Sequence, residues 1–256
     1  MIKLDNVSMA FRGRPVLDNI SLDIAEGEIM VIIGPSGSGK STILRLMIGL
    51  LKPLAGKIWI DGQEISGASE EELNIIRRNM GMVFQYSALF DSMTVGENVA
   101  FGLRQHTALS EEEIARTVRR RLRMVGLNGQ ESVMPSELSG GMKKRVSLAR
   151  AIAINPQIVL YDEPTAGLDP IMSTTIDRLI CSTRRVLNVT SVVVTHHMSS
   201  AFNIADRIAM IYDGRIIEIG TVSEIKKSSN PIVQQFIHGW AKPGEFAKRR
   251  SRRSES

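Results

Sequence analysis

The sequence contains a single cysteine, Cys181, among 256 residues. One cysteine can form neither an internal disulfide nor a metal site built from cysteines, which excludes disulfide-stabilised secreted folds and cysteine-based zinc modules. Cys181 lies in the apolar-patterned stretch TTIDRLICSTRRVL. We therefore expect it to be a small core residue in a reducing compartment.

Long apolar runs are missing as well. No run approaches the roughly 20 residues that a helix needs to cross a bilayer. The N-terminal stretch MIKLDNVSMAF has neither the apolar segment nor the cleavage site of a signal peptide. The hydrophobic content of 43% can build one large α/β domain or two closely packed subdomains. We expect a globular protein that stays in the cytoplasm.

The charge is moderately basic, with a formal net value of +5, and part of the excess lies in the final stretch AKRRSRRSES. A basic end suits nucleic acid or an anionic membrane surface, but it is more often simply a solvated terminus. The sign of the charge alone does not choose between these alternatives.

Strand patterns dominate both ends of the chain. Residues 1 to 33 alternate between apolar and polar side chains and predict antiparallel structure that leads into a buried strand. The stretches KIWIDGQEI and RIAMIYDGRIIEIG each place Asp-Gly between two β-rich runs, which predicts two hairpins. We expect both hairpins at the edge of the main sheet.

Three short apolar runs, IMVIIG, IVLYDE and SVVVTH, predict fully buried parallel strands, because each is continuous, β-branched and followed by a helical pattern. Ligands of open α/β sheets bind at the carboxyl ends of the strands. We expect side chains at these ends to converge on one crevice, namely Lys40, Asp162, Glu163 and His196.

The middle of the chain is helical in pattern. The stretch LSEEEIARTVRRRLRMVGL opens with a capping box from Ser110 to Glu113 and stops at Gly126. We expect residues 90 to 155 to form a mostly helical subdomain inserted in an α/β nucleotide-binding core. This core and insert would form one domain over residues 1–225, and residues 226–256 would form a C-terminal extension with the basic tail.

A phosphate-binding loop is predicted by the stretch GPSGSGKS, which matches G-x-x-x-x-G-K-[ST] between a predicted strand and a predicted helix. A chance turn rich in glycine and serine would not require these flanking elements. Backbone N–H groups would close around the β-phosphate, Lys40 would reach the β- and γ-phosphates, and Ser41 would bind Mg²⁺. The nucleotide-binding residues expected here are Gly34, Pro35, Ser36, Gly37, Ser38, Gly39, Lys40, Ser41 and Thr42.

Four polar residues at strand ends are candidates for the hydrolytic chemistry. Asp162 could hold Mg²⁺, and the adjacent Glu163 could polarise an attacking water. His196 could contact the γ-phosphate, and Gln85 could sense Mg²⁺ or water through an uncharged amide. Taken singly, an Asp-Glu pair is usually a solvated turn and such a histidine is more often structural, so their meaning depends on the phosphate-binding loop upstream.

A second anion-binding loop is predicted by SELSGGMKKR, which places a serine and two glycines before a basic helix. With it, the motifs resemble those of the ATP-binding cassette (ABC) ATPase family. The matching features are the Walker A loop, Gln85, the signature LSGGM at 138–142, the Walker B run IVLYDE, GLDP with Asp169, and His196. They occur in the family's order, and the resemblance covers residues 2 to 225.

The resemblance implies a P-loop NTPase (RecA-like) core with an antiparallel β subdomain and an inserted helical subdomain. It also implies ATP and Mg²⁺ as cofactors, with Ser41, Gln85 and Asp162 at the metal. Family members form head-to-tail homodimers, so the signature residues of one subunit would contact ATP bound to the other. These residues are Leu138, Ser139, Gly140, Gly141 and Met142.

Three positions depart from the usual family pattern. Met142 stands where glutamine is usual, and His197 stands where aspartate is common. By resemblance Phe11 would stack on adenine, although most relatives have tyrosine there. An aromatic residue in a strand pattern could instead belong to the core.

Four further stretches are similar to the Mla-type phospholipid transport ATPases, also called toluene-tolerance transporters: FQYSALFDSMTVGENVAFGLRQHT, MPSELSGGMKKRVSLARAIA, YDEPTAGLDPI and NPIVQQFIHGW. This resemblance implies a MlaE-like permease, an MCE-domain lipid-binding protein and phospholipid cargo in a Gram-negative envelope. It leaves room for a small regulatory subunit. The chain would lie on the cytoplasmic face of the inner membrane.

Two apolar sets have an open meaning at this point. Leu89, Phe90 and Val95 could form a groove for a permease helix, or they could be ordinary core of the helical insert. Near the C-terminus the alternatives are a clasp on a neighbouring subunit or packing on the chain's own domain, for Phe236, Ile237 and Trp240.

Rival functions remain within the ABC family. A nucleic-acid ABC ATPase usually carries coiled-coil inserts, zinc modules or two cassettes, none of which the sequence has, so no nucleic-acid partner is expected. A cell-division cassette and a nutrient-importer cassette differ from the main interpretation only through the subfamily resemblance.

Overall fold

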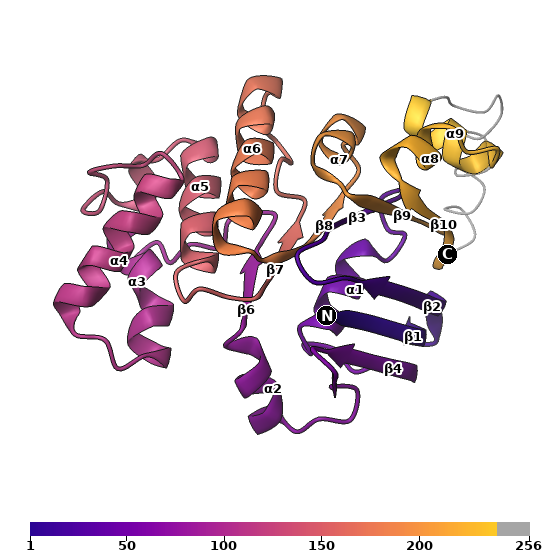
Figure 1. Ribbon diagram of the computed structural model, residues 1–256, viewed down its shortest axis with the longest axis horizontal. Helices are drawn as coiled ribbons and strands as arrows, with labels where there is room; N and C mark the ends of the chain where they lie inside the picture. The colour runs from indigo at the N-terminus through magenta and orange to yellow at the C-terminus, as the bar shows by residue number, and fades with distance from the viewer. Residues whose placement is uncertain (240–256) are drawn as a thin grey trace.

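The computed structural model describes residues 1–239, so Trp240 and the basic tail lie outside the described residues. Figure 1 shows a central sheet with helices on either side, an antiparallel sheet beside it, and a group of helices at the opposite end. Within residues 1–239, no helix combines the length and the apolar character needed to span a membrane.

The main sheet has six strands in the order β10-β9-β3-β8-β7-β6. All neighbouring pairs are parallel except β9 with β10. The three strands predicted from continuous apolar runs, β3, β7 and β8, are buried at every residue, which confirms that prediction. The strands are β3 (Ile29–Ile33), β6 (Met80–Val83), β7 (Ile158–Asp162), β8 (Thr190–Thr195), β9 (Arg207–Tyr212) and β10 (Arg215–Thr221).

A second, antiparallel sheet has the order β2-β1-β4-β5. The Asp61-Gly62 hairpin forms between β4 and β5 as predicted, but it lies at the edge of this sheet and not of the main one. The reason is that β4 is apolar on one face only and pairs with β1, whereas the parallel strands are covered on both faces. The Asp213-Gly214 hairpin does lie at the edge of the main sheet. The strands are β1 (Ile2–Phe11), β2 (Arg14–Ile24), β4 (Ala55–Ile60) and β5 (Gln63–Glu64).

The helices begin where the sequence provides caps. The predicted capping box is present, because the Ser110 side chain accepts from the Glu113 N–H and the Glu113 side chain accepts from the Ser110 N–H. Helices α3, α4 and α5 pack on one another and form the group at the left of Figure 1. The helices are α1 (Lys40–Met47), α2 (Glu70–Arg77), α3 (Val95–His106), α4 (Glu111–Met124), α5 (Gly140–Ala151), α6 (Pro170–Leu187), α7 (Met198–Ile204), α8 (Val222–Lys226) and α9 (Pro231–His238).

Two apolar clusters hold the layers together, one on each face of the main sheet. Along β3, Val31 and Ile33 belong to the cluster that contains α3, α4 and α5 residues, whereas Met30 and Ile32 belong to the cluster under the antiparallel sheet and α1. Successive strand residues point to opposite faces, so β3 is fixed from both sides. The loop that follows it therefore starts from a rigid position.

The alternatives left open for the apolar sets now have answers. Val95 is fully buried and belongs to the core, so it was wrong to expect it on a groove surface. Leu89 is partly buried, and Phe90 is 41% exposed. Phe236 and Ile237 are partly buried against the core of their own chain. Cys181 is only partly buried, but it packs against the same core.

Candidate functional site

The loop between β3 and α1 has the geometry of an anion cradle. Gly34, Gly37 and Gly39 have φ values of 153°, 81° and 104°, which L side chains rarely adopt. Helix α1 begins at Lys40 with no side-chain cap on its N-terminus and no acidic residue in its first turn. Unpaired N–H groups and the helix dipole at this end favour an anion such as a phosphate.

The space around the glycines supports the same interpretation. A Cβ atom on Gly34 would lie 2.2 Å from the Ile211 carbonyl oxygen, and one on Gly39 would lie 2.5 Å from a Leu17 methyl carbon. A Cβ atom on Gly37 would have no described atom within 4 Å. The two ends of the loop are therefore packed tightly, and its middle is open.

The other residues of the loop are distributed around this opening. Ser36 is exposed, Thr42 is buried, and the Pro35 carbonyl accepts a hydrogen bond. Ser38 is buried, and within residues 1–239 its hydroxyl oxygen has no hydrogen-bond partner. A buried hydroxyl without a partner is costly unless a ligand satisfies it, so the loop fits a bound phosphate.

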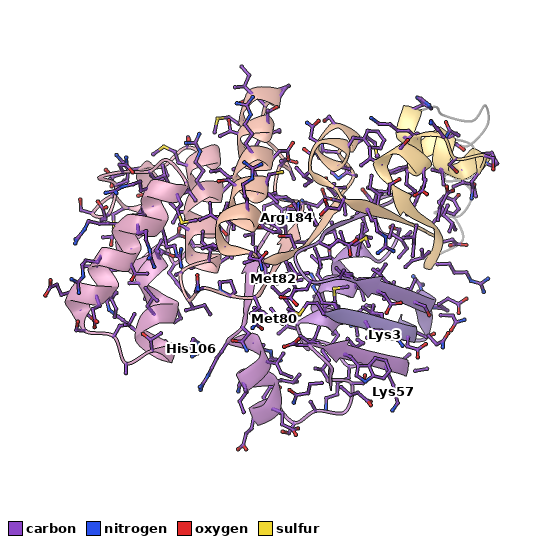
Figure 2. All side chains as sticks on the ribbon, viewed as in Figure 1. Lys3, Lys57, Met80, Met82, His106 and Arg184 are labelled. Atoms are coloured by element: carbon purple, nitrogen blue, oxygen red, sulfur yellow. The ribbon has the colours of Figure 1, made fainter. Side chains whose placement is uncertain are left out.

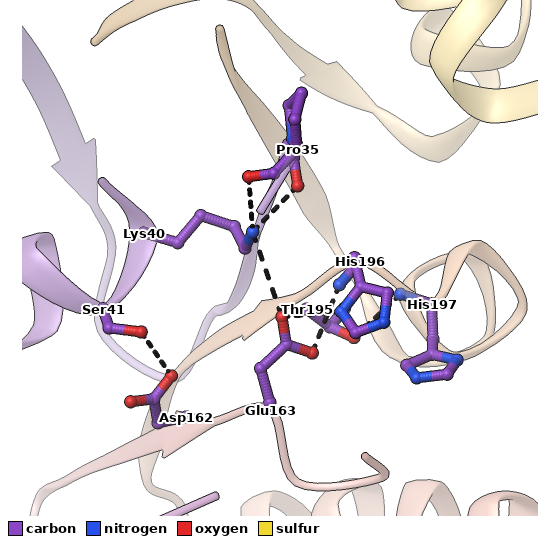
Figure 3. A network of polar contacts seen from close by, with 9 residues as sticks. Pro35, Lys40, Ser41, Asp162, Glu163, Thr195, His196 and His197 are labelled. Carbon is purple, nitrogen blue, oxygen red and sulfur yellow. Dashed lines mark hydrogen bonds and ion pairs between the residues drawn. The ribbon is translucent and has the colours of Figure 1, made fainter. Parts of the chain in front are cut away.

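Lys40 lies across the inside of the loop (Figure 3). Its buried ammonium donates to the Gly34 and Pro35 carbonyl oxygens at 2.8 and 3.0 Å and lies 3.9 Å from Glu163 Oε1. Burial lowers the pKa of Lys40, while the nearby Glu163 and Asp162 carboxylates oppose this shift. The loop thus holds a cation at the point where phosphate charge would be placed.

Ser41 and Asp162 are joined directly. The Ser41 hydroxyl donates to Asp162 Oδ1 at 2.8 Å, and Asp162 is only 8% exposed at the end of β7. Hydroxyl and carboxylate oxygens are suitable Mg²⁺ ligands, and Mg²⁺ at nucleotide sites usually takes one or two protein ligands, the rest being phosphate and water. The described residues contain no cluster of three or more His, Cys, Asp or Glu side chains, so this sparse set fits Mg²⁺ better than an all-protein metal cage.

Glu163 is fixed by the neighbouring strand. Its backbone has φ 47°, it is 7% exposed, and its Oε1 lies 2.9 Å from His196 Nδ1. Its Oε2 accepts from the His196 N–H at 3.3 Å. Because β7 pairs in parallel with β8, the residues after both strands meet at the same edge. The structure therefore brings Lys40, Asp162, Glu163 and His196 together, as Figure 3 shows.

Gln85 and Phe11 border this centre. Gln85 follows β6, which lies beside β7, and it is partly buried. Phe11 ends β1 and is 41% exposed, so it is not a core residue. An exposed ring of this kind is available for stacking.

The signature residues stand elsewhere in the chain. In Figure 1, α5 lies beside α4 and α6 on the left, whereas α1 lies on the right with the antiparallel sheet. Ser139 caps α5 by accepting from the Met142 N–H, and Asp169 caps α6. Ser139, Gly140 and Asp169 are exposed, Leu138 and Gly141 are buried, and Met142 is partly buried. One chain thus does not place its signature loop in its own phosphate cradle.

Two cations of α5 were missed by the sequence analysis. Lys144 donates to the Gln85 carbonyl oxygen, and Arg150 donates to the Ser87 and Ala88 carbonyl oxygens. Burial lowers the pKa of both groups. The available signal was weak: both cations sit in a helix whose residues Val146 and Leu148 are apolar and buried.

Residues 17–166 match the family described as ABC transporter. The chain belongs to this family. Its fold, predicted from the sequence as a P-loop ABC cassette, is confirmed by solved cassettes. The dimeric ATP-binding cassette MJ0796, in a post-hydrolysis state with ADP and Pi, is 36% identical with a TM-score of 0.80 and covers 87% of this chain and 99% of that one. The chain is an ATPase that uses ATP.

Two curated relatives cover nearly the whole chain. It is 43% identical over 239 residues to the intermembrane phospholipid transport system ATP-binding protein MlaF of Haemophilus influenzae, covering 93% of this chain and 90% of the relative. It is 40% identical over 238 residues to the probable ribonucleotide transport ATP-binding protein mkl of Mycobacterium leprae, covering 93% and 69%.

Proposed function

We propose that this ATPase is the homodimeric motor of a phospholipid transporter on the cytoplasmic face of the inner membrane, where it drives a MlaE-like permease. An MCE-domain protein would exchange lipid with that permease, and a small regulatory subunit could complete the complex. The observation that carries the cargo assignment is the 43% identity to MlaF over 90% of that relative's length.

The phosphate end of ATP would lie in the loop from Gly34 to Gly39, whose open middle is lined by backbone N–H groups. Lys40, now bound to two loop carbonyls, would turn its ammonium to the β- and γ-phosphates. Ser41 and Asp162 would hold Mg²⁺, with Gln85 close by. When bound, Mg²⁺ neutralises charge on the phosphates during the reaction.

Glu163 would act as the base that orients the attacking water and accepts its proton. Its carboxylate is buried, lies 3.9 Å from Lys40 Nζ, and is held at both oxygens by His196. A carboxylate with such constraints keeps its direction when the substrate arrives, which favours catalysis through positioning. His196 would therefore hold the base and lie near the γ-phosphate.

The signature loop would complete the site of a second subunit. Ser139 and Gly140 are exposed at the N-terminus of α5, which has no acidic residue in its first turn. This end favours an anion, and the chain's own cradle is elsewhere. ATP would thus lie between two subunits, with Phe11 stacked on adenine and Asp169 at the interface.

The permease would dock on aromatic side chains near the loop that carries Gln85. Tyr86 is 87% exposed and Phe90 is 41% exposed, and the Phe90 ring lies 4.9 Å from that of Phe101. Exposed aromatic clusters of this kind are typical of protein interfaces, and a short permease helix would fit such a surface.

Gentle detergent extraction of the tagged chain from its native membrane, followed by mass spectrometry of proteins and lipids, tests the proposal. We expect a MlaE-like permease, an MCE-domain protein and bound phospholipid. A nucleotide transporter, as the name of the mycobacterial relative suggests for that protein, a nutrient importer or a cell-division partner would overturn the cargo assignment. The ATPase assignment would stand in each case.

A further inference from the structure

The loop that carries Gln85 is held from outside by helix α5. The Lys144 ammonium donates to the Gln85 carbonyl oxygen. The Arg150 guanidinium forms a fork, with Nη2 donating to the Ser87 carbonyl oxygen at 3.0 Å and Nη1 to the Ala88 carbonyl oxygen at 2.7 Å. Two cations of one helix therefore bind three carbonyl groups in a stretch of four residues.

The held loop has an unfavourable backbone conformation. Ser87 has φ 63° and Ala88 has φ 46°, so two consecutive residues with side chains occupy the left-handed region. Such a conformation costs energy for residues other than glycine and persists where surrounding contacts enforce it. The internal backbone bonds of the loop are local ones, from the Ser87 N–H to the Phe84 oxygen and from the Ala88 N–H to the Tyr86 oxygen. The contacts from α5 supply the external constraint.

The two cations give up hydration to make these contacts. Lys144 is 6% exposed, and burial lowers its pKa, while the charges of Asp162 and Glu163 oppose the shift. Burial likewise lowers the pKa of Arg150, whose guanidinium carbon lies 5.7 Å from the centre of the Phe90 ring. A buried cation is costly unless it is well partnered, and here the partners are the carbonyl groups of this loop.

We propose that Lys144 and Arg150 are positioning residues that fix the backbone at 85–88 and thereby hold the Gln85 side chain at the Mg²⁺ site. The inference rests on the proposed role of Gln85 in the ATPase centre. Lys144 lies close enough to the Walker B acids to respond to their charge, so it connects the loop to that centre. Because α5 begins just after Ser139, the same helix joins the signature loop to the loop with Gln85.

Kinetics of the full-length ATPase test this role. With Lys144→Met or Arg150→Met, we expect kcat at saturating ATP to fall roughly tenfold or more and the Mg²⁺ concentration for half-maximal activity to rise severalfold, as for other residues that orient metal ligands. ATP affinity measured in EDTA should stay within about twofold, because neither residue contacts the phosphate loop. Arg150→Lys keeps one donor and should give an intermediate loss. Lys143→Met removes a charge from the same helix at a partly exposed position and should change little.

A double-mutant cycle separates positioning from general damage. Gln85→Ala should reproduce the Mg²⁺ effect, and adding Arg150→Met to it should cause little further loss, because residues that act through one another are not additive. Hydrogen exchange at residues 86–90 should be faster in Arg150→Met than in Lys143→Met. The inference is overturned if the Mg²⁺ requirement is unchanged, if the losses multiply, or if exchange at 86–90 is unaltered.

The same data separate this inference from the proposed function. If Gln85→Ala leaves the Mg²⁺ dependence unchanged while Glu163→Gln abolishes hydrolysis, the positioning role fails and the ATPase site stands. If the wild-type complex transports no phospholipid but the Mg²⁺ effects appear, the cargo assignment fails and the positioning role stands.

Discussion

His196 holds both carboxylate oxygens of Glu163: its ring Nδ1 lies 2.9 Å from Oε1, and its backbone N–H donates to Oε2 at 3.3 Å. The two residues follow neighbouring parallel strands, β7 and β8, so the sheet itself sets their separation. The carboxylate therefore has a fixed direction before any substrate binds. This pair is the geometric centre of the proposed hydrolytic site.

His196→Ala removes the ring contact but leaves the backbone N–H. We expect kcat for ATP hydrolysis to fall by about 10- to 100-fold, because misplacing a catalytic group by about an ångström has effects of this size. ATP affinity should change little. The matched control is His197→Ala, which removes the neighbouring ring, 4.3 Å away, without touching Glu163. An equal loss in both variants would contradict the specific role of His196.

Lys40→Ala should abolish productive nucleotide binding. A charge-assisted hydrogen bond contributes about 1.5–3 kcal/mol, so ATP affinity should fall by at least roughly tenfold in a titration with a fluorescent analogue. Lys40 also binds the Gly34 and Pro35 carbonyls, so thermal unfolding without nucleotide must be measured in parallel. Wild-type affinity in the folded variant would show that the loop does not hold phosphate through Lys40.

Phe11→Ala should weaken ATP binding about fivefold, since stacking of a base on an aromatic ring contributes on the order of 1 kcal/mol or more. Phe11→Tyr keeps the ring and should bind like the wild type. Leu54→Ala is a suitable control, because Leu54 is 68% exposed and lies outside the proposed site. Unchanged affinity in Phe11→Ala would remove the stacking role.

Mixed dimers test whether Ser139 serves the partner's nucleotide. A dimer with Ser139→Arg in one subunit and Lys40→Ala in the other has both defects in one shared site, so it should bind one ATP. A dimer with both substitutions in the same subunit has a defect in each site and should bind none. Counting ATP bound per dimer under non-hydrolysing conditions distinguishes the two. The reverse pattern would refute the shared site.

Much of the fold was predictable because its signals are local. The Asp61-Gly62 and Asp213-Gly214 turns, the Ser110 cap and the apolar run that forms β3 each depend on neighbouring residues. The position of the first hairpin was not predictable in this way. It depends on the pairing of β4 with β1, more than forty residues apart along the chain, and no local pattern specifies that partner.

The candidate site shows the same division. The loop from Gly34 to Ser41 and the acids after β7 follow from motif and strand context. Val95, expected on the surface, is buried because it starts a helix packed into the core, which apolar character alone does not reveal. The role of Arg150 was also hidden, because an arginine in a basic helix usually faces solvent and its carbonyl partners lie sixty residues away.

Steady-state hydrolysis by purified Glu163→Gln protein tests the account most directly. The amide keeps the shape of the side chain but cannot accept a proton, and loss of a general base costs about 10²- to 10⁴-fold in rate. We expect hydrolysis to fall by at least about 100-fold while ATP binds and the dimer persists on size-exclusion chromatography. Hydrolysis close to the wild-type rate would contradict the assignment of Glu163 as the base and with it the proposed centre.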